Sequence, residues 1–222
     1  MYSIYTDPKS LPTLGELESQ GKMWFMSCDI GKRNFAYTIV EVSLSQMKSL
    51  VDFKNDDSVI KKIYSNTRII SMDLQDFVGG TNIRVTQDIF NNITNYLDSV
   101  TPYFDLCKAF VLEKQLKKNP EAQRIEQHVY SYLVIRYKLS KDVISLLSRL
   151  KYTETGIPPT VKTKYYRKKW AWVRCKEILE EVGDQGALEY IFKTHKTKKD
   201  DLSDTLLQVY AFCRRVYVKE RL

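Results

Sequence analysis

Proline, glycine and cysteine are all scarce in this sequence of 222 residues, which contains 6, 8 and 4 of them respectively. So little proline and glycine excludes collagen-like and low-complexity chains. The two closest cysteines, Cys175 and Cys213, are 38 positions apart, which excludes a Cys-x-x-Cys pair and the spacing of a zinc ribbon. We therefore expect reduced thiols, and Cys28 and Cys107 lie inside apolar runs where they behave as small hydrophobic residues.

Long apolar runs and targeting signals are also missing. No run approaches the roughly 18 apolar residues of a membrane-spanning helix, so we expect no membrane span. Residues 1–20 lack the basic start and apolar centre of a signal peptide, and they are not the arginine-rich stretch of a transit peptide. Because Pro8, Pro12 and Gly15 interrupt regular structure there, we interpret residues 1–20 as an N-terminal extension and residues 21–222 as one domain.

The sequence does contain enough apolar residues for a core, together with an excess of positive charge. Hydrophobic residues make up 43% and aromatic residues 12% of the chain, which excludes an intrinsically disordered protein. The 35 basic residues outnumber the 27 acidic ones, giving a formal charge of +8. A basic globular protein suggests a polyanionic partner. The two histidines, His128 and His195, form no ligand pair or catalytic arrangement.

The apolar patterns predict strands first, then alternating helices and strands, and then helices. Strands are predicted over residues 22–29, 34–42, 67–74, 105–112 and 141–147. Helices are predicted over residues 81–100, from Pro120 onward, and over 165–181, 186–194 and 200–218. The stretch 151–164 is predicted to be a loop, because it contains two prolines, a glycine and several threonines. This order indicates a mixed α/β or α+β layer fold built on one sheet.

Two carboxylates directly follow predicted strands, and each precedes a basic segment. They are Asp29 and Glu113. Ligands in open α/β sheets gather at the carboxyl ends of strands, so parallel neighbouring strands would bring these two side chains together. The alternative for each is an ordinary acidic residue that begins a turn.

The last predicted helix adds two further acids. At about 100° per residue, Asp201 and Asp204 are neighbours on one face, beside the apolar stripe but outside it. The spacing does not exclude Asp200, which is also a helical neighbour of Asp204. The alternative is that acids in a first turn interact with the helix dipole or cap the helix.

Four carboxylates from three separate segments suit a site for two divalent metal ions. Mg²⁺ prefers oxygen ligands, and carboxylates that lie close together repel unless a cation neutralises them. Two such ions about 3.5–4 Å apart can stabilise both the attacking and the leaving oxygen in phosphodiester hydrolysis.

Positive charge is concentrated in three short segments, which hold 14 of the 35 basic residues. The three groups are Lys162, Lys164, Arg167, Lys168, Lys169, Arg174 and Lys176; Lys193, Lys196, Lys198 and Lys199; and Lys114, Lys117 and Lys118. Two of the groups adjoin the candidate carboxylates, an arrangement that suits a phosphate backbone as substrate. The alternative is a set of solvated helix faces, with the nearby tryptophans in the core.

Three motifs, in order along the chain, resemble those of the poxvirus and mitochondrial Holliday junction resolvases, which are related to bacterial RuvC. The motifs are Ser27-Cys-Asp29-Ile-Gly31-Lys-Arg-Asn34, Val111-Leu-Glu113-Lys-Gln115 and Lys199-Asp200-Asp201-Leu-Ser-Asp204. The resemblance covers residues 22 to 216. It implies an RNase H-like fold with a mixed five-stranded sheet flanked by helices. It also implies a homodimeric, Mg²⁺-dependent endonuclease that makes paired symmetric nicks at four-way DNA junctions.

By the same resemblance, Asp29 is the central ligand to two Mg²⁺ ions, for which Mn²⁺ can substitute, and Glu113, Asp201 and Asp204 are the other metal ligands. A catalytic lysine is implied in the Tyr166–Lys169 stretch, as either Lys168 or Lys169. The residues expected to bind nucleic acid are Lys32, Arg33, Lys114, Lys117, Lys118, Lys162, Lys164, Arg167, Lys168, Lys169, Lys198 and Lys199.

Other functions remain open at this point. The same fold could serve a nuclease for other branched DNA or for RNA–DNA hybrids, and the basic clusters would also suit a non-catalytic nucleic-acid-binding module. Residues 44–64 are interpreted either as an insertion or as a segment that binds something else. The lack of a transit peptide favours the cytoplasm, in particular the replication site of a large DNA virus in the host cytoplasm.

Overall fold

The computed structural model of the chain describes residues 1–5, 7–45, 64–79, 84–158 and 163–218. The segment 44–64, interpreted above as an insertion or a binding segment, falls mostly outside the described residues.

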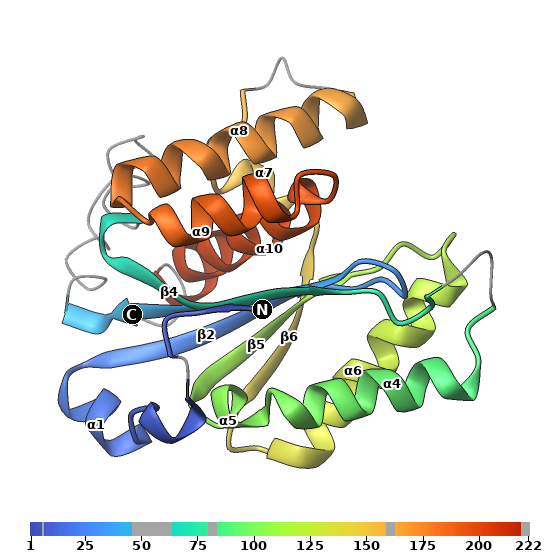
Figure 1. Cartoon of the computed structure of the whole chain (residues 1–222), viewed down its shortest axis with the longest axis horizontal. Helices are drawn as coiled ribbons and strands as arrows, with labels where there is room; N and C mark the ends of the chain where they lie inside the picture. The colour runs from blue at the N-terminus through green and yellow to red at the C-terminus, as the bar shows by residue number, and fades with distance from the viewer. Residues whose placement is uncertain (6, 46–63, 80–83, 159–162, 219–222) are drawn as a thin grey trace.

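A single mixed sheet of six strands forms the centre of the molecule (Figure 1). The strands are β1 (Tyr2–Ser3), β2 (Lys22–Asp29), β3 (Phe35–Ser43), β4 (Thr67–Gln75), β5 (Cys107–Lys114) and β6 (Asp142–Leu147). Their order in the sheet is β1-β4-β3-β2-β5-β6. Strand β3 is antiparallel to both β2 and β4, whereas β5 is parallel to β2 and to β6. The parallel pair β2 and β5 therefore ends at the same edge of the sheet.

The predicted mixed α/β fold is confirmed, but the sheet has one strand more than the predicted five. The additional strand lies within residues 1–20, where Tyr2 and Ser3 pair antiparallel with Met72 and Ser71 of β4. The same segment forms a 3₁₀ turn at Pro8–Ser10 and the helix α1 (Leu14–Ser19), which begins with a capping box between Thr13 and Glu16. The expectation that Pro8, Pro12 and Gly15 interrupt regular structure was therefore only partly right, since these short elements fit around them.

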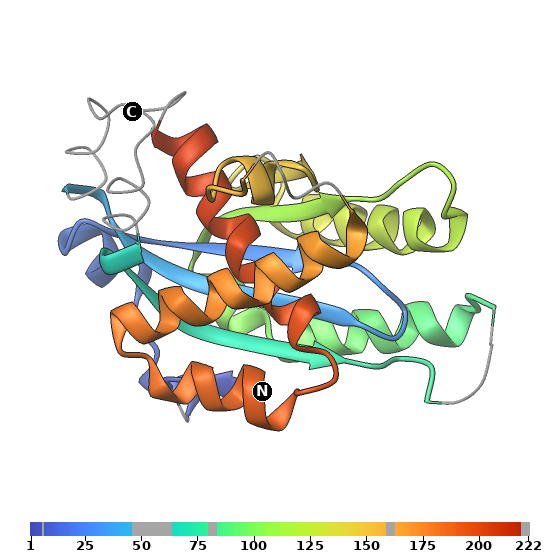
Figure 2. The same ribbon diagram turned by 90° about the horizontal axis from the view of Figure 1, so that it is seen from above.

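Helices cover both faces of the sheet. Below it in Figure 1 lie α1, α4 (Gln87–Ser99), α5 (Thr101–Phe104) and α6 (Pro120–Tyr137); above it lie α7 (Leu150–Thr153), α8 (Lys164–Val182), α9 (Gln185–Glu189) and α10 (Lys199–Phe212). Seen from above, α8 and α10 lie across the strands (Figure 2). Of the described helices, none is both long and apolar enough to cross a membrane.

Each face of the sheet packs its own hydrophobic core, because side chains alternate along a strand. In β2, Phe25 points toward α8 and α10, while Trp24 and Met26 point toward α4 and α6. All three are fully buried. The ring of Phe25 meets that of Phe212 edge-on, with 5.4 Å between their centroids, and this contact fixes the end of α10 against β2.

Several predicted helix boundaries were wrong. The predicted loop 151–164 begins with a helix, α7, whose four residues are too few to show a helical period. Predicted helix 81–100 begins only at Gln87 among the described residues. The predicted helices 186–194 and 200–218, by contrast, have their predicted extent to within one residue, although their ends are π-helical over Tyr190–Thr194 and Cys213–Val218.

Candidate metal and nucleic-acid site

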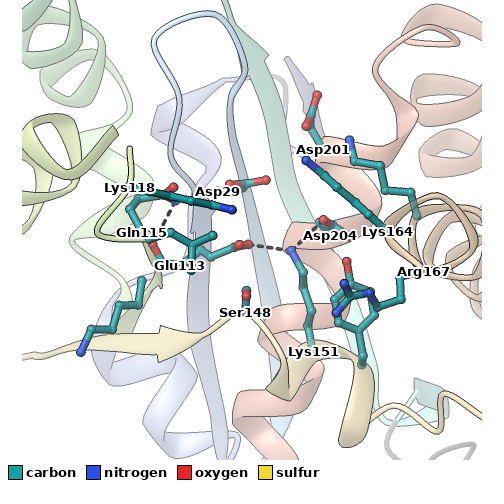
Figure 3. Close-up of a pocket in the computed structure, with 14 residues that line it drawn as sticks. Asp29, Glu113, Gln115, Lys118, Ser148, Lys151, Lys164, Arg167, Asp201 and Asp204 are labelled. Atoms are coloured by element: carbon teal, nitrogen blue, oxygen red, sulfur yellow. Dashed lines mark hydrogen bonds and ion pairs between the residues drawn. The ribbon is translucent and has the colours of Figure 1, made fainter. Parts of the chain in front are cut away.

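Asp29 and Glu113 lie side by side because β2 and β5 are parallel and in register. Cys28 is paired with Leu112, so the next residue of each strand is an acid at the same edge of the sheet. Helix α10 crosses this edge and contributes Asp204 (Figure 3). Each of the three acids offers one carboxylate oxygen, and these oxygens all lie within 4.8 Å of one another. Three acids that are far apart in the sequence thus form one cluster, which we call the carboxylate cluster.

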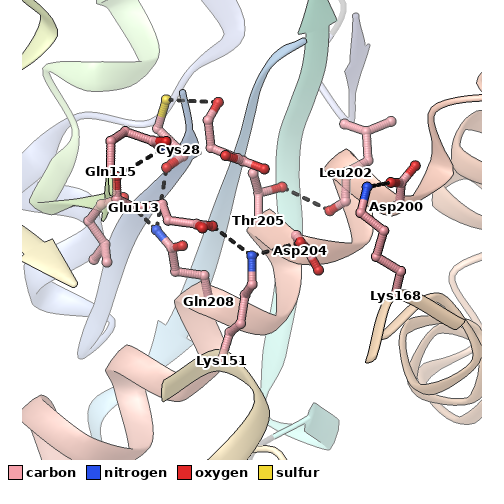
Figure 4. A network of polar contacts seen from close by, with 12 residues as sticks. Cys28, Glu113, Gln115, Lys151, Lys168, Asp200, Leu202, Asp204, Thr205 and Gln208 are labelled. Carbon is pink, nitrogen blue, oxygen red and sulfur yellow. Dashed lines mark hydrogen bonds and ion pairs between the residues drawn. The ribbon is translucent and has the colours of Figure 1, made fainter. Parts of the chain in front are cut away.

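Buried polar contacts hold α10 at this edge. Gln208 donates through Nε2 to the backbone oxygen of Val111 at 3.1 Å and to that of Cys28 at 3.4 Å, so one side chain connects α10 to both central strands. Thr205 is hydrogen-bonded to Thr38 of β3 at 2.7 Å. Because Asp204 lies one turn before Gln208, these contacts determine where its carboxylate lies (Figure 4).

The structure separates the predicted acids of α10. Asp204 is 7% exposed and belongs to the carboxylate cluster. Asp201 lines the same cavity but is not among the three clustered acids. Asp200 forms an ion pair with Lys168. Both acids line one cavity, which agrees with the expectation that they share a helix face beside the apolar stripe, but Asp204 is more deeply buried because α7, α8 and the sheet surround α10 on nearly every side.

Lys151, the cation at the centre of this site, was not predicted from the sequence. Its Nζ donates to Glu113 Oε2 and to Asp204 Oδ2, both at 2.6 Å, and the residue is only 3% exposed. Lys151 is the second residue of α7, in the segment that was predicted to be a loop. The available signal was indirect, because buried carboxylates need a positive partner from somewhere in the chain.

Burial governs the electrostatics of the acids. It raises the pKa of Asp29 well above its usual value, and the charge of Glu113 adds to this while Lys151 opposes it. Burial likewise raises the pKa of Asp204, and Lys151 offsets this only in part. The pKa of Asp201 is raised to about 6, first by burial and then by the charge of Asp200. For Lys151, burial by itself lowers the pKa, but the charges of Asp204 and Glu113 outweigh it and raise the pKa well above normal.

The carboxylate cluster fits a hard divalent cation. Its donors are carboxylate oxygens, the ligands that Mg²⁺ and Mn²⁺ take in proteins. Asp204 Oδ1 is buried and has no hydrogen-bond partner among the described residues, although its Oδ2 accepts from Lys151. A buried carboxylate oxygen without a partner is costly, and coordination of a metal ion would remove that cost.

A cavity of about 500 Å³ opens over the carboxylate cluster, with basic residues on both sides. Lys114 and Lys118 lie on the side formed by the end of β5 and the loop after it. Lys164 and Arg167 lie on the opposite side, in the first turns of α8 (Figure 3). Lys168 of the same turns also lines the cavity. The acids lie at the floor of the cavity, where a metal ion would bind, and the cations lie along its two sides, where they can contact the phosphates of an extended nucleic-acid strand.

The other predicted nucleic-acid contacts that the structure describes lie outside this cavity. Lys32 is paired with Glu121 at 2.7 Å, and Arg33 lies 4.0 Å from Asp76. Lys117 lines a neighbouring cavity, and the Nζ of Lys199 lies 4.2 Å from the centroid of the Trp172 ring. Lys169 and Lys198 are exposed. Lys162 is outside the described residues. Lys176 and Lys193 form exposed ion pairs one helical turn away, as the solvated-face alternative implies. Arg174 is less exposed: it is paired with Glu177 and lies over the ring of Tyr64, 5.5 Å from its centroid.

The raised carboxyl pKa values give a pH prediction. Without metal, these acids hold protons in the folded state at pH values where the unfolded chain, with a pKa of about 3.9, does not, so their contribution to stability falls as pH rises. A bound cation replaces those protons. The pKa of Asp201 is about 6. We therefore expect Mg²⁺ to raise the melting temperature more at a pH two units above this pKa than at a pH one unit below it.

Thermal melts with excess Mg²⁺ or with chelator, at matched ionic strength, measure this difference. An equal shift at both pH values would show that the ion does not compete with protons for these carboxylates.

Among the proteins similar to this chain are two from viruses. It is 27% identical over 223 residues to uncharacterized protein 170L of Invertebrate iridescent virus 6, which covers 86% of this chain and 88% of that protein. It is 25% identical over 211 residues to uncharacterized protein 97L of Invertebrate iridescent virus 3, which covers 84% of this chain and 97% of that protein. No protein-family profile matches the chain.

The fold is similar to that in the crystal structure of the yeast mitochondrial Holliday junction resolvase Ydc2. The TM-score is 0.50 at 14% sequence identity, over 86% of this chain and 78% of that one. The resemblance found in the sequence motifs is thereby confirmed at the level of the fold.

Proposed function

We propose that this protein is a Mg²⁺-dependent endonuclease with an RNase H-like fold that resolves four-way DNA junctions. The observation that carries the proposal is the convergence of Asp29, Glu113 and Asp204 beneath a cavity that has basic residues along two opposite sides. The likeness of the fold to a resolvase supports the choice of branched DNA as substrate. Residues 21–222 would form the nuclease domain, with residues 1–20 as an extension on its sheet.

In this proposal each part of the site has a separate task. The carboxylate cluster would hold the cation, with Asp201 at the edge of the cavity as a further ligand. When bound, the cation would activate a water molecule and stabilise the charge on the leaving oxygen. The lysines and the arginine on the two sides of the cavity would bind phosphates before and after the scissile bond, which fixes the strand without reading its sequence.

Paired symmetric nicks follow from symmetry rather than from a single chain. A four-way junction has two equivalent strands to cut, and a homodimer with a twofold axis presents two equivalent sites. We therefore propose that the active form is a homodimer. The two viral relatives suggest that it acts in recombination or repair of viral DNA, at a replication site in the host cytoplasm.

Cleavage of a matched panel of labelled substrates tests the function. The panel contains a four-way junction, a fork, an RNA–DNA hybrid and a linear duplex, each with Mg²⁺, with Mn²⁺ and with chelator. We expect paired cuts in the junction with either metal, and none with chelator. Preference for the hybrid or the fork would indicate a different nuclease of this fold, and binding without cleavage in any condition would indicate a non-catalytic module.

The structure also distinguishes the two candidate lysines of α8. Lys168 lines the cavity and is held by Asp200, whereas Lys169 is exposed and does not line it. We expect Lys168→Ala to slow single-turnover cleavage about 100- to 1,000-fold, in the range of removing one charge-stabilising group. It should also reduce the salt dependence of binding by about one phosphate contact. Lys169→Ala is the matched control and should change the rate by less than about 2-fold. Equal effects of the two substitutions would contradict this assignment.

A further inference from the structure

The ammonium of Lys151 occupies the space between two of the proposed metal ligands. Its Nζ lies 2.6 Å from Glu113 Oε2 and 2.6 Å from Asp204 Oδ2, so it bridges the two carboxylates as a shared cation would. The sequence motifs imply two metal ions at this site. In the structure, one oxygen from each of two acids is already bound to a positive charge that belongs to the chain itself.

Charge balance in the carboxylate cluster points the same way. When ionised, its three acids carry three negative charges, and one ammonium together with one divalent cation balances them. Two divalent cations in addition to the ammonium would set five positive charges against these three negative ones, or against four when Asp201 at the edge of the cavity is counted. The two carboxylate oxygens of Asp204 also differ. Oδ2 accepts a hydrogen bond from Lys151, whereas Oδ1 has no partner among the described residues and is therefore the oxygen left to coordinate a metal ion.

Lys151 is held firmly in this position. The residue is 3% exposed and lies on the short helix α7, which packs against α10. Just after α7, the side chain of Glu154 is paired with Arg215 at 3.1 Å, and Arg214 donates to the backbone oxygen of Glu154. These contacts connect the end of α7 to the π-helical segment Cys213–Val218, which directly continues the helix α10 that carries Asp204. A lysine fixed on both sides in this way is suited to be a permanent part of the site.

We propose that Lys151 takes the place of a second metal ion, so that each chain holds one divalent cation and one fixed ammonium. This inference rests on the proposed function and sets its metal count at one per chain, where the resemblance of the sequence motifs implies two. Asp29 and Asp204 Oδ1, with the second oxygen of Glu113, are the groups left to hold the cation. Lys151 neutralises Glu113 and Asp204 from the other side and is therefore a positioning residue for both ligands.

The number of bound ions tests the inference without any DNA. Mn²⁺ is titrated into the metal-free wild-type protein, and free Mn²⁺ is counted by electron paramagnetic resonance. We expect one Mn²⁺ per chain, with no magnetic coupling of the kind shown by two ions about 3.5–4 Å apart. Two coupled ions in a protein that cleaves junctions would overturn the inference and leave the proposed function intact. No bound ion would overturn both.

Removing the ammonium should open the second position. Lys151→Met keeps an unbranched apolar side chain of the same length as the lysine stem and removes the ammonium. We expect the metal-free variant to melt at a lower temperature than wild type, and we expect Mn²⁺ to restore stability while the count rises from one ion to two. Lys168→Met is the matched control, because Lys168 lines the same cavity but is paired with Asp200 outside the carboxylate cluster; its count should stay at one.

A folded Lys151→Met protein that still binds one ion would contradict the inference, since the second position would then be absent for a reason unrelated to the ammonium. If this variant folds neither with nor without Mn²⁺, the wild-type count alone decides between one ion and two.

Discussion

Asp29→Asn is expected to abolish Mg²⁺-dependent cleavage of a four-way junction while leaving junction binding close to that of wild type. Asp29 ends β2 at the centre of the sheet and belongs to the carboxylate cluster, whereas the residues proposed to bind phosphates lie on the sides of the cavity. Loss of this ligand should slow single-turnover cleavage at least about 10³-fold, which corresponds to about 4 kcal/mol of transition-state stabilisation. Binding should change less than about 3-fold, because the phosphate contacts supply most of the affinity.

Asp88→Asn provides the matched control for this experiment. It makes the same chemical change in an exposed first-turn residue of α4, on the other face of the sheet. Its cleavage rate and affinity should both equal those of wild type. Normal cleavage by Asp29→Asn would refute the assignment of the active site. An equal loss of cleavage and binding would mean that Asp29 acts on the fold or on DNA affinity rather than on the chemistry.

Phe25→Ala is expected to cause the largest loss of stability, about 3–5 kcal/mol of the free energy of unfolding. The side chain is fully buried in β2 and meets Phe212 edge-on, so its removal leaves a cavity between the sheet and α10. For a domain with a typical total stability of about 5–15 kcal/mol, this loss is large. Equilibrium unfolding in urea measures it.

Two control substitutions make the stability result specific. Phe25→Leu keeps most of the buried volume and should cost less than about 1.5 kcal/mol. Leu139→Ala changes a residue that is fully exposed after α6 and should have an effect within about 0.5 kcal/mol. A loss below about 1 kcal/mol for Phe25→Ala would contradict the packing of α10 on β2, and with it the placement of Asp204 beside Asp29.

The long elements of the fold could be predicted because their patterns are long enough to be unambiguous. Strand β2 was predicted with its exact bounds, since a buried central strand is a continuous apolar run that ends at a polar residue. Strand β1 and helix α7 were missed, because two and four residues are too few to show a period. Their structure depends on partners far away in the chain, namely β4 for the strand and α10 for the helix.

The candidate site was only partly predictable for the same reason. Asp29 and Glu113 could be found, since each directly follows an apolar run and parallel strands bring such residues to one edge. The different environments of Asp201 and Asp204 could not, because the helical angle places a residue on a face but does not say what covers that face. Nothing in the sequence around Lys151 indicated its role. That role depends on its contacts with Glu113 and Asp204, which lie 38 positions before it and 53 positions after it.

The most direct test of the central claim is to map the metal site on the polypeptide itself. Fe²⁺ replaces Mg²⁺ at sites made of carboxylate oxygens, and with ascorbate and peroxide it generates hydroxyl radicals that cut the nearby backbone. We expect cuts close to residues 29, 113 and 204 in the same protein, suppressed by excess Mg²⁺ and absent in Asp29→Asn. Cuts at one of these positions without the others, or a pattern that Mg²⁺ does not suppress, would contradict the convergence of the three acids on one cation.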